Sequence, residues 1–315
     1  MDFADQFRKS AYVQQYSFEL EREVSSNILL SAGYLGSRSD RLGIGSVNIN
    51  QLDPGWLELG PALLEPVPNP FYGNPLFGNL SESPTIARNQ LLRPYPQFGA
   101  LSALQVSAGK RRYHAAVVKA ERRFRRGWGG RVNYVWSRND DNIFGEFNAF
   151  SEARFLALDN YALDGEYSRS ITDTPHRLNV SGIVELPFGR GKRWLDGDGL
   201  ANALLGGWTF SAAGFYQSGF PVNVFQRLNN TGLLGDLQRP TVVPAVHPGH
   251  AGSTEENLET YLNPEAWSQT PAFTFGNAPR TDARVRSPFR QNWDFAFQKS
   301  LRASTFIPCA CSGDM

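Results

Sequence analysis

The 315-residue chain contains only two cysteines and two methionines, and its opposite charges nearly cancel. Two cysteines are too few for a disulfide scaffold or an iron–sulfur protein. The 31 basic and 30 acidic residues give a formal net charge of +1, which excludes a simple basic binder of nucleic acid or anionic lipid. No stretch approaches the ~18 uninterrupted apolar residues of a transmembrane helix. These absences exclude several common protein classes.

The beginning of the chain lacks the features of a secretory signal. Asp2 and Asp5 stand where a signal peptide has a basic region, and Gln14 interrupts the sequence before an apolar segment forms. We therefore expect either a protein that stays inside the cell or one whose N-terminus is missing.

Glycine, proline and aromatic residues are abundant, with 30 Gly, 20 Pro, 22 Phe, 11 Tyr and 7 Trp. Glycine and proline break helices, whereas aromatic side chains pack well on a pleated sheet. Alternation of apolar and polar residues then predicts seven strands. They cover approximately residues 12–20, 28–34, 113–124, 131–137, 177–186, 208–217 and 292–298. The predicted fold class is all-β.

The connections between these strands alternate between short and long. The shorter ones lie near residues 24–27, 125–128 and 187–207. The long ones, near residues 36–112, 138–175 and 217–290, far exceed the usual loop of about 4–6 residues. Outer-membrane barrels sort their loops in this way, with short periplasmic turns and long extracellular loops. We predict an antiparallel up-and-down transmembrane β-barrel fragment of about seven strands, which forms an open curved sheet.

Aromatic residues and charges support this prediction from opposite faces of the strands. The outward face should carry two aromatic girdles, one at the long-loop ends (Tyr34, Trp136, Tyr216, Trp293) and one at the short-turn ends (Phe124, Trp128, Trp208). The other face carries charges that a wet or plugged lumen would solvate: Glu19, Glu21, Lys119, Glu121, Arg123, Arg131 and Arg177. A soluble antiparallel sheet with one wet face is the alternative.

No motif nominates a catalytic centre, a cofactor site or a metal site. The histidines are His114, His176, His247 and His250, and the close pair His247 and His250 lacks a cysteine or carboxylate partner. Cys309 and Cys311 lack the second pair of a zinc ribbon. No nucleophile elbow or P-loop is present. We expect a protein that is not an enzyme and has no cofactor.

Pairs of acidic residues leave calcium binding as an open alternative. Residues 196–199 (DGDG) resemble the start of a calcium loop, but a leucine follows and no glutamate closes the loop, so a polar turn is favoured. Pairs such as Asp140 and Asp141 leave calcium in the long loops as an alternative.

One basic cluster, Arg122, Arg123, Arg125 and Arg126 with Phe124 and Trp128, could suit single-stranded nucleic acid. We favour a periplasmic turn whose arginines meet lipid phosphates and whose aromatic residues lie in the girdle. No nucleic-acid partner is therefore expected.

Several segments form one pattern. They are LRPYPQFG at 92–99, YH at 113–114, KAERRF at 119–124, YVWS at 134–137, PHR at 175–177, LPFGRGK at 186–192, LGGW at 205–208, QSGFP at 217–221 and FGNAPR at 275–280. Together, over most of residues 12–301, they resemble the barrel of Oar-like TonB-dependent outer-membrane receptors. The resemblance implies a carboxypeptidase-regulatory-like domain and a plug before a barrel of about 22 strands. In that family, a proton-motive signal through TonB unseats the plug and lets a substrate cross.

The chain departs from this family at both ends. No TonB box, plug or regulatory domain precedes Tyr12, and seven strands are about a third of a complete barrel. Residues 1–302 are expected to be a partial barrel. Residues 303–315 do not alternate and contain both cysteines, so we interpret them as a non-family tail, as a frameshift would produce.

The resemblance implies an outer-membrane location, contacts with outer-membrane lipid and, in the full-length family, a plug and TonB as partners. A chain without plug or TonB contact is not expected to transport on its own. Loops near 40–110, 139–174 and 222–289 would form the substrate entrance, and their Trp, Tyr and Asn content suits sugars or peptides. The alternative is a soluble or surface-exposed all-β adhesion or carbohydrate-binding protein.

Overall fold

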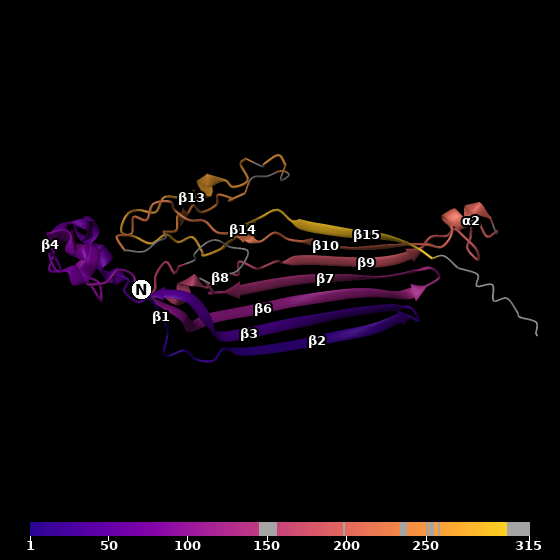
Figure 1. Cartoon of the computed structure of the whole chain (residues 1–315), viewed down its shortest axis with the longest axis horizontal. Helices are drawn as coiled ribbons and strands as arrows, with labels where there is room; N and C mark the ends of the chain where they lie inside the picture. The colour runs from indigo at the N-terminus through magenta and orange to yellow at the C-terminus, as the bar shows by residue number, and fades with distance from the viewer. Residues whose placement is uncertain are drawn as a thin grey trace, which may run out of the picture.

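A computed structural model describes residues 1–144, 156–197, 199–233, 238–249, 252, 255–257 and 259–300. Its main feature is one large sheet (Figure 1). Seven strands follow one another across it: β2 (Tyr12–Ser25), β3 (Ile28–Asn48), β6 (Ser102–Arg125), β7 (Trp128–Asp141), β9 (His176–Glu185), β10 (Trp208–Gln217) and β15 (Arg290–Lys299). Each pairs antiparallel with the next. The all-β, up-and-down prediction and all seven predicted strands are confirmed.

Smaller elements border this sheet. β1 (Asp2–Ala4) pairs parallel with β6, and β8 (Ser168–Arg169) pairs with β7. Three two-stranded ladders join β4 (Pro66–Pro68) to β5 (Thr85–Ala87), β11 (Pro221–Val222) to β14 (Asp282–Arg286), and β12 (Thr241–Val242) to β13 (Trp267–Ser268). The helices are short: η1 (Pro54–Leu64), η2 (Pro75–Ser81), α1 (Arg88–Leu91), η3 (Leu163–Glu166), α2 (Leu200–Leu205) and η4 (Pro264–Ala266). Within the described ranges, no helix is long and apolar enough to cross a membrane.

The connections divide between the two ends of the sheet. The turns after β2 and β6 and the segment with α2 lie at one end, and the three long connections lie at the other (Figure 1). In the turn from β6 to β7, Arg126 and Gly127 both have positive φ, at 55° and 85°. This conformation suits a two-residue hairpin because its twist matches that of the strands. The predicted sorting of loops is confirmed.

Two strands, β3 and β6, exceed their predicted lengths by the most. Residues 36–48 and 102–112 were expected in a loop, but β3 and β6 stay paired as far as Asn48 opposite Ser102. Beyond Tyr34, β3 carries polar residues and glycines on both faces, so the alternation that marks a half-buried strand is lost. Register shifts after Asp40 and Leu42 interrupt the period further.

Most of the buried apolar residues lie at the long-loop end, in the long connections and the adjoining ends of β3 and β6. One cluster contains Ile44, Val47, Phe144 and Ala157, and a second contains Leu52, Leu63 and Leu233. The sheet itself keeps large apolar residues exposed: Phe18 is 63%, Val118 53% and Phe297 65% accessible. A water-soluble sheet would bury such a face against a second layer, whereas a membrane strand leaves it to lipid.

The sheet is open. β2 and β15 are its two edges, and no ladder joins them among the described residues. Every residue of β2 is exposed. The predicted open sheet is therefore present. The predicted tail at 303–315, with Cys309 and Cys311, lies outside the described residues.

Candidate functional site: the two faces and the loop end of the sheet

Cross-strand register assigns each strand residue to a face. Leu30 lies opposite Ala120, Ala120 opposite Val132, and Val132 opposite Val180. Directly opposed residues point to the same side of a sheet. This face, which we call the outward face, therefore carries a continuous apolar band across at least four strands.

A row of aromatic rings borders this band on the long-loop side. Ring centroids are 6.1 Å apart for Tyr16 and Tyr34, 6.2 Å for Tyr34 and His114, 6.2 Å for Tyr134 and His176, and 5.8 Å for Tyr216 and Trp293. The Tyr134 hydroxyl and His176 Nδ1 share a 2.7 Å hydrogen bond. Trp136 lies opposite His176. The predicted girdle is present, and sequence reasoning missed the part that histidines play in it.

The position of this row corrects one expectation. Tyr34 and Trp136 were placed at strand ends, but β3 runs on to Asn48 and β7 to Asp141. The strands therefore project beyond the apolar band, where both of their faces can be polar.

The second aromatic row lies near the short turns. The guanidinium of Arg122 lies 3.7 Å from the ring centre of Trp128, and the ammonium of Lys299 lies 5.3 Å from that of Trp208. Phe124 is 51% exposed beside them. Cations stacked on aromatic rings suit a boundary between hydrocarbon and water. The structure thus places the basic cluster at a hairpin end beside this row.

The opposite face, the inward face, carries cross-strand ion pairs. Lys119 Nζ lies 2.6 Å from Glu19, Arg131 lies 2.5 Å from Glu121, and Arg123 lies 3.4 Å from Glu23. The members of these pairs are 37–63% accessible. All seven predicted charges share this face, because the register keeps them out of step with the apolar band. Such a surface suits water.

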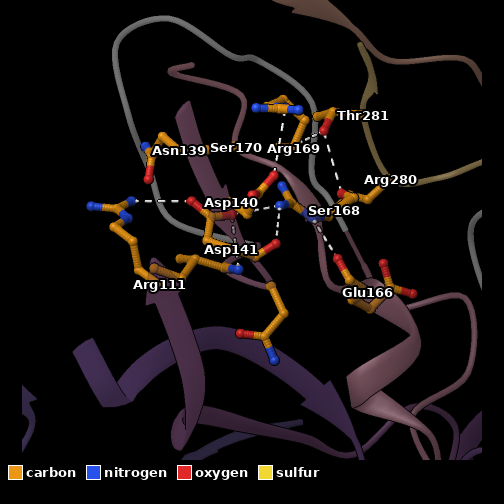
Figure 2. Close-up of polar contacts among 12 residues, drawn as sticks. Arg111, Asn139, Asp140, Asp141, Glu166, Ser168, Arg169, Ser170, Arg280 and Thr281 are labelled. Carbon is orange, nitrogen blue, oxygen red and sulfur yellow. Dashed lines mark hydrogen bonds and ion pairs between the residues drawn. The ribbon is translucent and has the colours of Figure 1, made fainter. Parts of the chain in front are cut away.

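At the long-loop end, several charged side chains are buried. Arg280, in the connection between β10 and β15, donates to the Asp141 carboxylate at 2.5 Å and to the Asp141 carbonyl at 2.9 Å (Figure 2). Arg280 Nε donates to the Glu166 carbonyl at 3.3 Å. Burial lowers the pKa of the Arg280 guanidinium, and the Asp141 carboxylate opposes that shift. Asp141 lies at the end of β7, so this contact fixes one long loop to the strand ends.

Further ion pairs join the same loops. Glu166 forms a buried ion pair with Arg239. Asp173 is fully buried, lies 2.6 Å from Arg286 and 3.7 Å from Arg169, and accepts the backbone N–H of Asn139 at 2.7 Å. We call the contacts of Asp141, Glu166 and Asp173 with their arginines the loop-end ion network. It links the connection after β7 to the connection after β10.

The first long loop is held mainly by amides. The Asn50 side chain donates to the carbonyls of Tyr95, Phe98 and Gly99, at 2.9, 3.1 and 2.7 Å, and accepts the Tyr95 N–H. Asn50 is fully buried. The LRPYPQFG segment at 92–99 therefore folds around one buried amide, which gives part of the motif a structural role.

Two motif glycines lie where chain segments approach closely. A Cβ on Gly219 would lie 1.6 Å from the Ser287 carbonyl oxygen, and one on Gly276 would lie 1.8 Å from the Arg239 carbonyl oxygen. Neither glycine has a positive φ. Space rather than backbone conformation therefore requires glycine in QSGFP and FGNAPR.

The metal candidates have other contacts. Asp140 pairs with Arg138 at 2.6 Å and Asp141 with Arg280, so arginines neutralise the acids considered for calcium. His247 Nδ1 contacts the backbone of Gly249, and His250 and Asp198 lie outside the described residues. In the part of the chain that the structure describes, no group of three His, Cys, Asp or Glu could hold a metal ion.

The family model for an outer membrane beta barrel domain matches residues 1–306. The chain belongs to this family. As an outer-membrane β-barrel protein it resides in the outer membrane, where lipid meets its outward face. This assignment favours the membrane-spanning interpretation over the soluble all-β alternative.

Among solved structures, this barrel domain is similar to the outer membrane transporter YddB from Escherichia coli, with 8% identity and a TM-score of 0.38. The match covers 73% of this chain and 24% of that one, so the chain spans about a quarter of its length. No curated protein matches the chain.

Sequence reasoning found the two faces but not the loop-end ion network. Arg280 and Asp141 are 139 residues apart, and no local pattern connects them. The acidic pair Asp140 and Asp141 at the end of β7 is the sequence feature that could have indicated this network. From the sequence alone, we interpret this pair as a candidate calcium site instead.

Proposed function

We propose that this chain forms part of the wall of an Oar-like TonB-dependent outer-membrane receptor. The observation that carries the proposal is the contrast between faces: an apolar band between two aromatic rows outward, and solvated ion pairs inward. A wall of this kind separates lipid from a wet or plugged lumen. The sequence segments that resemble the receptor family support the finer assignment.

In this proposal the loops after β3, β7 and β10 form the extracellular entrance for a substrate. The loop-end ion network keeps two of these loops together at the long-loop end of the sheet. The proposal assigns the chain no enzymatic activity and no cofactor. It also makes the chain insufficient for transport by itself, because a plug and TonB have to couple substrate passage to the proton-motive force.

Site-directed labelling in intact cells tests the orientation. In a background with Cys309→Ser and Cys311→Ser, Ser83→Cys in the first long loop should react with a membrane-impermeant maleimide. Ser26→Cys, in the turn after β2, should react only after the outer membrane is permeabilised. Labelling of Ser26→Cys in intact cells, or recovery of the chain in a soluble fraction, would contradict the proposed wall.

The receptor assignment has a separate test in the genomic DNA around the reading frame. Translation in all frames should show plug-like sequence upstream and further barrel strands downstream. Intergenic DNA on both sides would remove the TonB-dependent part of the proposal and leave the outer-membrane barrel domain.

A further inference from the structure

The two edge strands of the sheet run in the same direction. β2 runs from the long-loop end to its short turn at Ser26–Asn27, and β15 runs from the long connection after β10 to the end that carries α2 (Figure 1). This follows from the count, because seven successive antiparallel strands give the first and the last the same direction.

Because β2 and β15 run in the same direction, only some partners can close the sheet. If β15 paired with β2, of the same or another copy, the new ladder would be parallel. Membrane barrels close through antiparallel neighbours, and single-chain bacterial barrels have an even number of strands. A second copy with its loops on the same side of the membrane would again present two edges of the same direction. Copies of this seven-strand sheet therefore cannot complete one another.

The free edge of β2 has its own chemistry. Phe18 and Leu20 point outward and are each 63% exposed, ready to face lipid. Glu19, Glu21 and Glu23 point inward along the same edge. Lys119 and Arg123, two strands away on β6, reach Glu19 and Glu23. Glu21 lies between these pairs and has no ion pair with a described residue.

We propose that β2 is completed by a strand that runs toward the long-loop end and presents lysine or arginine inward, opposite Glu21. The whole gap between β15 and β2 then takes an odd number of strands, none of them from a second copy of this seven-strand sheet. A basic inward residue on the partner strand extends the ion pairs that already join β2 and β6 side chains. An apolar outward face extends the apolar band. This inference rests on the proposed barrel wall.

Disulfide trapping tests whether copies pair. Two chains without native cysteines are co-expressed, one with Ser17→Cys on β2 and the other with Ala296→Cys on β15. Both positions face inward and lie near the middle of their strands. No disulfide should form between the copies in the outer membrane. A disulfide between the cysteines introduced at positions 17 and 296 would overturn the inference. It would leave the labelling test of the wall unaffected.

A peptide probe tests direction and charge. The probe has the sequence of residues 28–38 with Ser31→Lys and an added N-terminal cysteine, and it is refolded with the full chain in detergent micelles. It should form a disulfide with Ser25→Cys at the short-turn end of β2 and not with Val13→Cys at the other end. Cross-linking to Val13→Cys instead, or to neither, would overturn the proposed antiparallel partner.

The matched probe carries Ser31→Glu in place of Ser31→Lys. Like charges opposite one another destabilise a strand pair, so its cross-link yield to Ser25→Cys should fall about five-fold. Equal yields of the two probes would overturn the basic chemistry assigned to the partner strand. Glu21→Gln in the chain should reduce the difference between them.

Discussion

Two regions of this barrel domain use the same ion pair chemistry in different surroundings. On the inward face, Lys119 and Glu19 are 42% and 39% accessible, whereas Arg280 and Asp141 at the loop end are 1% and 2% accessible. Water solvates the first pair whether or not it forms, so the pair contributes little to stability. Each member of the second pair has lost its water and depends on its partner. Burial, rather than the number of ion pairs, decides which charges hold the molecule together.

The largest effect is expected from breaking the buried pair. Arg280→Met leaves the Asp141 carboxylate buried without its main partner and should destabilise the folded protein by about 3–5 kcal/mol. Urea unfolding in detergent micelles, followed by tryptophan fluorescence, measures this loss.

The double variant Asp141→Leu with Arg280→Met is its control, because it removes both charges. It should recover most of the stability. A loss of equal size in the double variant would show that packing, and not the unpaired carboxylate, sets the cost.

A charge placed on the outward face tests a third environment, the lipid. Val132 lies midway between Trp128 and Trp136 on β7, and Val132→Lys should cost about 2–4 kcal/mol in a bilayer. The neighbouring inward variant, Asn133→Lys, should cost clearly less than Val132→Lys, because the inward face already carries charged side chains. Folding titrations in lipid vesicles measure both, and equal costs would contradict the assignment of the faces.

An intermediate effect is expected at Asp40, which lies on β3 beyond the aromatic row and is 25% accessible. Hydrogen bonds from Arg112 and Arg38 hold the pKa of this carboxyl below its usual value. Its stabilisation is therefore present above the unfolded pKa of about 4 and is lost as the pH falls through the lower folded pKa.

Unfolding midpoints measured from pH 7 down to pH 3 should fall more steeply for the wild type than for Asp40→Asn. At pH 7 the variant should be about 1 kcal/mol less stable. Parallel pH profiles for the two proteins would contradict this role.

The smallest effect is expected from the exposed inward pair. Lys119→Met should change stability by no more than about 1 kcal/mol, since both partners are solvated in the wild type. A double-mutant cycle with Glu19→Gln isolates the pair's own contribution. A coupling energy as large as that of Arg280 and Asp141 would show that the inward face is dry.

The sequence predicts this fold where the signal is local. Alternation over a few residues identified the seven strands and assigned Val132 and Asn133 to opposite faces, because the side-chain period of a strand is two. It failed at residues 36–48, where polar residues and glycines interrupt the alternation and the pairing with neighbouring strands maintains β3. It also missed Arg280, because contacts between distant loops leave no periodic trace.

The turn at Arg126–Gly127 has a consequence for how the sheet assembles. A two-residue connection brings β6 and β7 together at a small entropic cost, whereas β3 and β6 meet only after the loop over residues 49–101 closes. We therefore expect the hairpins to form first, from the turn outward, and to join into a sheet later. The short turns would then nucleate folding, and the long-loop end would become ordered last.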